Sequence, residues 1–571
     1  MLENIICFLT NLLSFDAQFP LLFTQFYFWA FFALVFAGLT LLKKKILQRN
    51  TFLMFVSLFF YFKTSGLFVI LLLFTTLNCF WVGKRIDVTV NLKKRKWFVF
   101  AGIFINLLLL AYFKYAYFFT SIYNSMFNSD VEIVNYLALW ANNFTRSTYF
   151  RVDNIILPVG ISFYTFQSIS YIIDVYRRRI SHTSNFFDFG FFVSFFPGLV
   201  AGPIIRANQF MPQLYKKFFL SRRQFGKAVF WILNGLIKKL ILSDYLAVNF
   251  VDRVIENPHF FTSFENLAAI FVYSLQVYAD FSGYTDIAIG VAMLMGFYMP
   301  KNFNSPYKAT NAGDFWKRWH ISLSTWLKDY LYIPLGGNRK GKFRTNVNTM
   351  LTMLLGGLWH GASWNFVIWG GLNGLGILIF KRWRKFDNAK RMGITLFFFN
   401  LSFLFYVLFP YPALKIATVW TGIICLGGLL SYFYVDFYQR KPLTKLNRGW
   451  SIFLTFLFIT FTRLFFRSGS NLDPSEQASH AWKTAKVIVN QIGGTWNWAQ
   501  IPEIIVTYWA VFLLFALGMF IHWFPERWKR WYRLNFALLP LWVIGISVVV
   551  VVFVVYQFIT ADLQPFIYFQ F

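Results

Sequence analysis

Long apolar runs separated by short basic clusters dominate the hydrophobicity pattern of this chain. Windows of roughly 20 mainly apolar residues, the length that crosses a bilayer as a helix, recur along nearly the whole sequence, about a dozen in all. Between them, Lys and Arg gather in short groups, for example at residues 43–45, 93–96, 177–179 and 339–344. Helices satisfy their own backbone hydrogen bonds inside lipid, so the pattern predicts an all-α polytopic membrane protein.

Composition supports this class and excludes others. Hydrophobic residues make up 57% of the 571 residues and charged residues only 13%, which is too apolar for a soluble core of ordinary proportions. The formal net charge of +31 lies in the clusters between apolar runs, as in cytoplasmic loops, so no nucleic-acid partner is expected. The three scattered cysteines have neither metal-ligand spacing nor a disulfide framework, and we expect no metal site.

The distribution of Lys and Arg predicts the topology. No Lys or Arg precedes Lys43, so the first span, at about residues 21–42, is expected to run from outside to cytoplasm. The apolar stretch 51–82 then has basic groups on both sides and must cross twice or dip and return. Basic loops at 440–448 and 527–533 alternate with the later apolar runs. We therefore expect both termini on the external face of the membrane.

Two apolar segments predict interrupted helices at membrane depth. Residues 186–205 contain Phe-Pro-Gly and Gly-Pro breaks, and irregular backbone in a membrane is tolerated only inside protein or beside a cavity, so we predict a re-entrant element lining one. Residues 345–380 carry no charged residue and have basic clusters on both sides. This segment is expected to enter and leave on the cytoplasmic side. A helix from Arg344 would then carry His360 up to roughly 24 Å inward, close to the turn.

Two histidines stand in aromatic, glycine-rich sequence. His360 is flanked by Trp359 and Trp364, and His320 ends the segment FWKRWH (315–320). An imidazole at membrane depth needs a partner or a function, because an unpaired polar group in hydrocarbon is costly. From the residues alone, His360 is either a structural histidine or a general base, a role that suits a group titrating near neutrality.

A polar face follows the predicted span 267–297. Gln276, Asp280 and Tyr284 recur at i, i+4 and i+8 and so share one side of a helix. A charge near the bilayer centre costs roughly 2.5 to 3.5 kcal/mol on insertion scales, so Asp280 is expected to face protein or water. Interhelical hydrogen bonding and a part in a substrate path are both open.

The segment 311–329 predicts an amphipathic helix at the cytoplasmic interface. Trp316, His320 and Ser324 would share one face of it, and the tryptophan rings would anchor it.

A glycine-rich basic loop, PLGGNRKGK (334–342), comes next. Backbone N–H groups and the charges of Arg339, Lys340 and Lys342 suit phosphate binding. Positive-inside bias explains the same charges, so both interpretations are open.

Six segments resemble, in chain order, the bacterial membrane-bound O-acyltransferases, and among these the alginate O-acetyltransferase type. They are PVGISFYTFQ (158–167), DVYR (174–177), FPGLVAGPI (196–204), YADFSGY (278–284), FWKRWH (315–320) and LWHG (358–361). The resemblance is strong over about residues 150–380, and the closing FIYFQF (566–571) is also similar. Six ordered motifs are far more specific than any one of them.

The resemblance implies an architecture for the chain. It implies about 11 to 13 transmembrane or re-entrant helices in a ring, around a tunnel that joins a cytoplasmic acyl-donor site to an extracytoplasmic acceptor site. Residues 1–150 would form N-terminal transmembrane helices that match the family weakly. Residues 151–380 would form the catalytic core, and residues 381–571 the C-terminal transmembrane helices.

The resemblance also implies roles for particular residues. His360 falls on the family's catalytic histidine and His320 on its second active-site position. Asn373 stands where relatives often carry histidine, which puts a third-histidine role in doubt. The residues expected to support the site or line a substrate path are Asp280, Gln276, Tyr284, Trp316, Ser324 and Trp359, and those expected to bind the donor are Arg339, Lys340 and Lys342.

The expected function is O-acetylation of a secreted or cell-surface polysaccharide at the bacterial inner membrane. Acetyl-CoA would be the donor substrate, with no bound cofactor, and a periplasmic partner resembling an SGNH-type esterase could relay the acetyl group. D-alanyl transfer from a carrier protein to teichoic acid is one alternative. A transporter of polysaccharide or lipid is another, because such folds also place polar residues on broken helices at the midplane.

Overall fold

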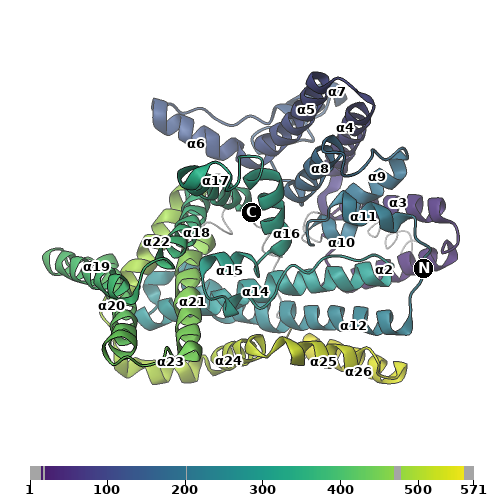
Figure 1. Ribbon diagram of the computed structural model, residues 1–571. Helices are drawn as coiled ribbons and strands as arrows, with labels where there is room; N and C mark the ends of the chain where they lie inside the picture. Colours follow the sequence, from purple (N-terminus) through teal and green to yellow (C-terminus); the bar gives the residue numbers. More distant parts are fainter. Residues whose placement is uncertain (1–13, 17–19, 201, 469–476, 559–571) are drawn as a thin grey trace. The chain divides into compact units, whose positions relative to one another are not determined.

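The computed structural model describes residues 14–16, 20–200, 202–468 and 477–558 (Figure 1). Throughout this part the chain is helical, with turns and loops and without a strand. Six stretches are long and apolar enough to cross a membrane, or seven if Trp498–Thr507 and Trp509–Trp523, bent by 83°, form one span. The six are Ile46–Val88, Leu92–Phe127, Asn388–Leu408, Pro412–Phe437, Thr444–Ser468 and Leu541–Phe558. The prediction of an all-α, multi-pass membrane protein is confirmed, while the ring around a tunnel stays a prediction.

The chain folds into two compact units. Unit 1 contains the residues up to Ile237, together with Ser282–Lys301 and Lys529–Tyr556. Unit 2 contains Lys238–Phe281 and Asn302–Trp528. The division passes through two helices, α14 (Ser263–Leu294) and α25 (Glu526–Phe536). The predicted division at residues 150 and 380 rests on likeness to a family and stays a prediction.

Unit 1 is organised around two almost wholly buried helices, α8 and α9. Helix α8 packs against α4 and α5, and α9 packs against α3. The helices of this unit are α2 (Phe26–Leu41), α3 (Ile46–Ser65), α4 (Val69–Val88), α5 (Leu92–Leu110), α6 (Ala116–Phe127), α7 (Tyr136–Thr145), α8 (Ile161–Tyr176), α9 (Phe186–Ser194), α10 (Phe196–Leu199), α11 (Ala207–Leu214), α12 (Arg222–Leu236) and α26 (Leu541–Phe558).

The interruption predicted within residues 186–205 is confirmed. Helix α9 stops at Ser194, and Phe195 turns away from helical geometry with φ −50° and ψ 99°. The short α10 then begins with Pro197 in its first turn, where a missing N–H costs no helical hydrogen bond. The residues of both helices are largely buried, so this break lies inside protein. Its re-entrant course through a membrane stays a prediction.

Unit 2 contains two antiparallel helical hairpins, α17 with α18 and α19 with α20 (Figure 1). Helix α18 also packs against α21 and α15. The helices of this unit are α13 (Asp252–Glu256), α15 (Ala312–Trp316), α16 (Ile321–Leu327), α17 (Gly341–His360), α18 (Trp364–Trp383), α19 (Asn388–Leu408), α20 (Pro412–Tyr432), α21 (Thr444–Ser468), α22 (Gln477–Gly493), α23 (Ile501–Thr507) and α24 (Trp509–Trp523).

The prediction of one amphipathic helix over residues 311–329 is wrong. The chain forms α15, breaks, and resumes as α16, with His320 at the break in left-handed backbone geometry (φ 43°, ψ 57°). The N–H groups of Ile321 and Ser322 bond to Asn302, which ends the helical ladder. Trp316 is buried rather than exposed, so it is no interfacial anchor.

Candidate active site

His360 is the last residue of α17, at the turn of the hairpin, as its sequence position predicts. Its side chain is buried, and three aromatic rings surround it: the ring centroids of Trp359, Trp369 and Phe466 lie 4.9, 5.1 and 5.4 Å from that of the imidazole. These contacts hold the imidazole in one place at the end of α17.

Two glycines allow the hairpin to bring its helices this close. A Cβ at Gly357 would lie 2.3 Å from the carbonyl oxygen of Phe366, and a Cβ at Gly370 would lie 2.4 Å from that of Met353. Both distances are below any real contact, so the two backbones meet where side chains are absent. The position of His360 depends on this close approach.

His320 is fully buried at the start of α16. Its Nδ1 lies 3.2 Å from Oδ1 of Asn302, and its ring meets Phe281 edge to face at 4.7 Å. The backbone N–H of Ser322 and the Ser322 hydroxyl donate to the same Asn302 oxygen, at 3.1 and 2.9 Å. Because a backbone N–H can only donate, the Asn302 atom is an acceptor, and His320 Nδ1 must carry the proton.

The structure brings the two histidines together although 40 positions separate them. Their ring centroids are 6.3 Å apart, and Trp359 lies against both rings. Both residues belong to unit 2. The pair forms one candidate site, whose chemical roles stay predictions.

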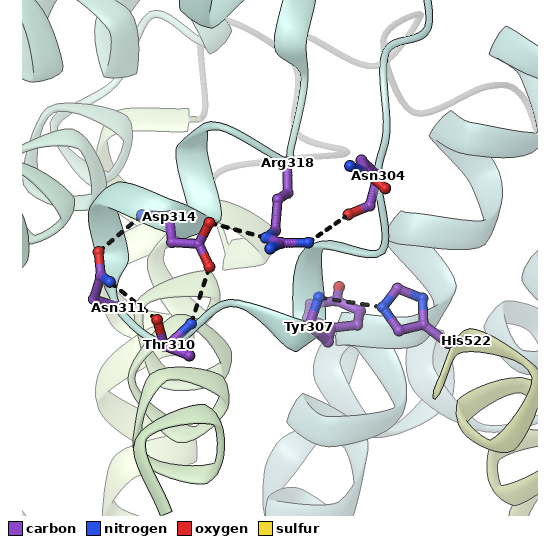
Figure 2. Close-up of polar contacts among 7 residues, drawn as sticks. All are labelled: Asn304, Tyr307, Thr310, Asn311, Asp314, Arg318 and His522. Atoms are coloured by element: carbon purple, nitrogen blue, oxygen red, sulfur yellow. Dashed lines mark hydrogen bonds and ion pairs between the residues drawn. The ribbon is translucent and has the colours of Figure 1, made fainter. Parts of the chain in front are cut away.

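The loop that leads to His320 is braced by polar contacts (Figure 2). Asp314 accepts hydrogen bonds from Arg318 Nε at 2.9 Å and from the N–H of Thr310 at 3.2 Å, and Asn311 caps the first turn of α15. Arg318 also reaches the carbonyl oxygen of Asn304 at 3.4 Å. The backbone between Asn304 and His320 is thus held at several points, which positions His320 against its neighbours.

Helix α21 contributes a buried arginine that the sequence analysis missed. Arg463 Nη1 donates to the Tyr307 hydroxyl at 2.6 Å and to the Ser274 carbonyl at 2.9 Å, and the guanidinium lies 4.2 Å from the ring centroid of Trp319. One turn further along α21, Phe466 packs against His360. The sequence did contain a signal for Arg463, because an arginine within an apolar span usually has a function or a charged or polar partner.

A third histidine also lies among aromatic rings. His522, on α24, is buried and meets Tyr278 and Tyr307 with ring centroids at 4.7 and 5.1 Å. Its Nε2 accepts a hydrogen bond from the N–H of Tyr307 at 3.2 Å, as Figure 2 shows. Its apolar, aromatic neighbours are distant in sequence, so the local pattern did not single it out.

The residues of the predicted polar face of α14 contact different parts of the protein. Asp280 forms an ion pair with Lys239 at 2.7 Å, and Lys239 also reaches Asp244 at 2.8 Å, so Asp280 belongs to a buried charge cluster. Tyr284 lies in unit 1, where its ring stacks on Phe23 at 4.8 Å. Buried carboxylates need such partners. These contacts favour the interhelical interpretation for Asp280.

Of the remaining predicted site residues, Trp316 contacts the candidate site, whereas Ser324 and Gln276 have other surroundings. Trp316 donates from Nε1 to Asn373 Oδ1 at 3.2 Å and contacts Trp369, which faces His360, so it supports the site. Ser324 instead donates to the nearby carbonyl of Trp319 at 3.3 Å, and Gln276 is partly buried on α14. Asn373 thus orients the Trp316 ring.

The glycine-rich basic loop is an exposed turn before α17. Gly336, Gly337 and Gly341 have φ values of 110°, 55° and 80°, which side chains other than glycine rarely adopt. Asn348 donates to the Gly337 carbonyl at 2.9 Å and fixes the turn. The side chains expected to bind the donor, those of Arg339, Lys340 and Lys342, are exposed.

Comparison with known proteins identifies the family of this chain. Residues 50–417, which include both histidines, match the model of the MBOAT, membrane-bound O-acyltransferase family. A probable alginate O-acetylase AlgI of Azotobacter vinelandii is 36% identical over 482 residues, covering 82% of this chain and 91% of that protein. The corresponding protein of Pseudomonas putida is 40% identical over 346 residues, 60% of this chain and 67% of its own. A peptidoglycan O-acetyltransferase of Helicobacter pylori is 35% identical over 437 residues, 70% of this chain and 79% of its own. The chain therefore belongs to the membrane-bound O-acyltransferase family and is a multi-pass membrane acyltransferase.

Proposed function

We propose that this protein takes acetyl groups from cytoplasmic acetyl-CoA and delivers them across the bacterial inner membrane for O-acetylation of a secreted or cell-surface polysaccharide. The observation that carries the proposal is the pair of buried imidazoles with ring centroids 6.3 Å apart. The names of the relatives, alginate O-acetylase and peptidoglycan O-acetyltransferase, support an acetyl group and a glycan acceptor.

In the proposed reaction His360 is the general base. It removes the proton from an acceptor hydroxyl as the oxygen attacks the thioester carbonyl carbon of acetyl-CoA. The new carbon–oxygen bond forms, the carbon–sulfur bond breaks, and the proton passes to the thiolate of coenzyme A. An imidazole suits both the uptake and the return of this proton, because its ordinary pKa lies near neutrality.

The hydrogen bond to Asn302 indicates which of two roles His320 would have, orienting the acceptor or stabilising the developing oxyanion. With the proton held on Nδ1 by Asn302, neutral His320 presents Nε2 as an acceptor. An acceptor can hold the hydroxyl hydrogen of an incoming alcohol, but it cannot donate to the oxygen of the thioester carbonyl. The geometry thus favours orientation of the acceptor over stabilisation of the developing oxyanion.

The direction of transfer rests on the positive-inside distribution of charge. The exposed loop with Arg339, Lys340 and Lys342 is expected to face the cytoplasm, where acetyl-CoA is found. The acetyl group would leave on the outer side, either directly to the glycan or through a periplasmic SGNH-type partner. Both termini are expected on that outer side.

Reconstituted vesicles test this function. Protein oriented in liposomes receives acetyl-CoA labelled in its acetyl group on one side and a polysaccharide or a soluble hydroxyl acceptor on the other. We expect labelled acetyl ester on the acceptor side, together with free coenzyme A on the donor side. Transfer of D-alanine from a carrier protein, with no acetyl transfer, would contradict the proposal. Mass spectrometry of surface polysaccharides from a deletion strain then identifies the acceptor.

A further inference from the structure

A group of basic side chains lies where α12 meets α25 in unit 1. Arg223 and Lys227 are one turn apart on α12, and Arg533 comes from the part of α25 that belongs to the same unit. Arg222 joins them at the start of α12 and donates to the carbonyl of Leu539 at 3.3 Å. Segments about 300 positions apart thus contribute like charges to one place.

Close packing fixes this arrangement. A Cβ at Gly226 would lie 2.7 Å from the carbonyl oxygen of Ala537, so the two backbones touch. The guanidinium of Arg533 lies 5.1 Å from the ring centroid of Trp231, and Phe230 packs against Tyr532 at 5.6 Å. Such contacts fix α12 against α25, so the basic side chains on the two helices stay near each other.

The charges gathered here repel one another. Burial, followed by the positive charges of Arg223 and Arg533, lowers the pKa of Lys227. Within the part of the chain that the structure describes, no ion pair joins Lys227, Arg223 or Arg533 to a carboxylate. Positive side chains held together without a protein counter-ion suit an anionic ligand.

The surface beside these basic side chains indicates which class of anion they would bind. Trp531 is 61% exposed on α25, and α26, an apolar helix long enough to cross a membrane, begins at Leu541. Core residues of α12 and α26, Val229, Leu233 and Ile544, pack together, so the basic group lies close to the start of this helix. Exposed tryptophan and basic side chains beside the end of a membrane span are typical of the lipid headgroup level.

We propose that Lys227, Arg223 and Arg533 form a binding site for the phosphate of an anionic phospholipid headgroup. These residues are not part of the candidate active site, and the proposal does not depend on the proposed acetyl transfer. The lipid would neutralise the repulsion among the three side chains and tie α12 to α25. Exposed Trp531 would lie beside it at the membrane surface.

Native mass spectrometry of the protein released from nanodiscs of equal phosphatidylcholine and phosphatidylglycerol content tests the proposal. The wild type should retain phosphatidylglycerol preferentially. Lys227→Gln with Arg533→Gln should lower this preference by on the order of tenfold. The charge-matched control, Lys441→Gln with Lys445→Gln at exposed positions just before and within the first turn of α21, should keep it.

The charge-conserving pair Lys227→Arg with Arg533→Lys should keep the preference as well, which separates loss of charge from loss of folding. Equal phosphatidylglycerol retention by the wild type and by Lys227→Gln with Arg533→Gln overturns the site. So does displacement of the lipid by inorganic phosphate or by acetyl-CoA at matched concentration, since that result would assign the side chains to a soluble phosphate ligand.

Discussion

At the scale of single residues, the two imidazoles differ in what their neighbours allow. His360 lies among three aromatic rings at the end of a helix, whereas His320 is held by the Asn302 oxygen in left-handed backbone geometry. A non-glycine residue in that geometry persists only where its surroundings hold it there. His360 is therefore the candidate base, and His320 the candidate for orienting the acceptor.

The first prediction concerns His360→Ala. We expect acetyl transfer to fall by 10²- to 10⁴-fold or more, the usual contribution of a positioned base, while membrane insertion and expression stay near wild type. The measurement is labelled acetyl transfer in membranes normalised to folded protein. His259→Ala is the control, because His259 is exposed and outside the site. Undiminished transfer by the His360 variant would remove its role as base.

The second prediction concerns Asn302 as a positioning residue. Asn302→Leu removes the acceptor that fixes the His320 proton, and we expect kcat to fall on the order of 10- to 100-fold. Asn302→Asp keeps the acceptor but adds a negative charge that favours the imidazolium of His320. If neutral His320 is the active form, the acid limb of the pH–rate profile moves to higher pH in this variant.

A merely structural role for Asn302 predicts a different result. Loss of stability would lower the amount of folded protein in both variants without moving the pH profile of the protein that remains. An unchanged profile in Asn302→Asp would thus contradict control of His320 through this hydrogen bond.

At the scale of elements, the hairpin of α17 and α18 is the part on which the site depends most. Its helices approach backbone to backbone at Gly357 and Gly370, and its turn holds His360. Helix α21 then closes the site with Phe466, while Arg463 on the same helix holds Tyr307 and the Trp319 ring next to His320. The consecutive helices α17 and α18 and the more distant α21 thereby position the two rings.

The third prediction uses two glycines of this hairpin. Gly357→Ala should destabilise the protein by about 1 to 3 kcal/mol, because its Cβ would meet the backbone of Phe366. Gly371→Ala should be neutral or stabilising, since its Cβ would meet only the flexible Leu354 side chain at 3.3 Å and alanine favours a helix. Thermal unfolding in detergent compares them. Equal melting temperatures for the two variants would contradict the close packing.

The fourth prediction concerns the glycine-rich loop as the donor entrance. Coenzyme A carries several phosphate charges, so Lys340→Gln with Lys342→Gln should raise the half-saturating acetyl-CoA concentration and make it less dependent on salt. Acceptor dependence should hardly change. Lys441→Gln with Lys445→Gln is the control for net charge. If the loop charges serve topology alone, fewer molecules insert, but each keeps the wild-type donor dependence.

At the scale of the whole molecule, the distribution of Lys and Arg predicts the membrane topology, which the packing of the helices alone does not. Residues 177–179, 339–344 and 381–385 are basic clusters between apolar runs in the central part of the chain. The positive-inside rule places these loops in the cytoplasm and both termini outside. The hairpin that holds His360 would then enter and leave the membrane on one side.

The fifth prediction tests this topology with single cysteines. After the native Cys7, Cys79 and Cys425 are replaced, a cysteine at position 340 should react with an impermeant reagent only from the cytoplasmic side. Lys340 is exposed, so the label can reach this position. A cysteine near the C-terminus should react from the outside in the same cells. Labelling of position 340 from the periplasmic side would overturn the re-entrant path of α17 and α18.

The sequence by itself determined the features that depend on local composition and order. Apolar runs of membrane-spanning length predicted an all-α membrane protein, Pro and Gly predicted the break between α9 and α10, and the uncharged stretch placed His360 at a turn. Six ordered motifs indicated the family. These features follow from solvation and backbone geometry, which act on neighbouring residues.

Only the tertiary structure decided which polar groups meet. Lys239 pairs with Asp280, Arg463 lies over Trp319, and Asn302 determines which nitrogen of His320 carries its proton. None of these partners is related by helical spacing, so no periodic pattern reveals them. The helix predicted through His320 does not form, because the N–H groups of Ile321 and Ser322 donate to Asn302 instead of to carbonyl groups one helical turn earlier. Asn302 is distant in sequence, so the local pattern does not reveal it. Local pattern sets where apolar segments lie, whereas buried polar groups are satisfied by residues that only folding brings near.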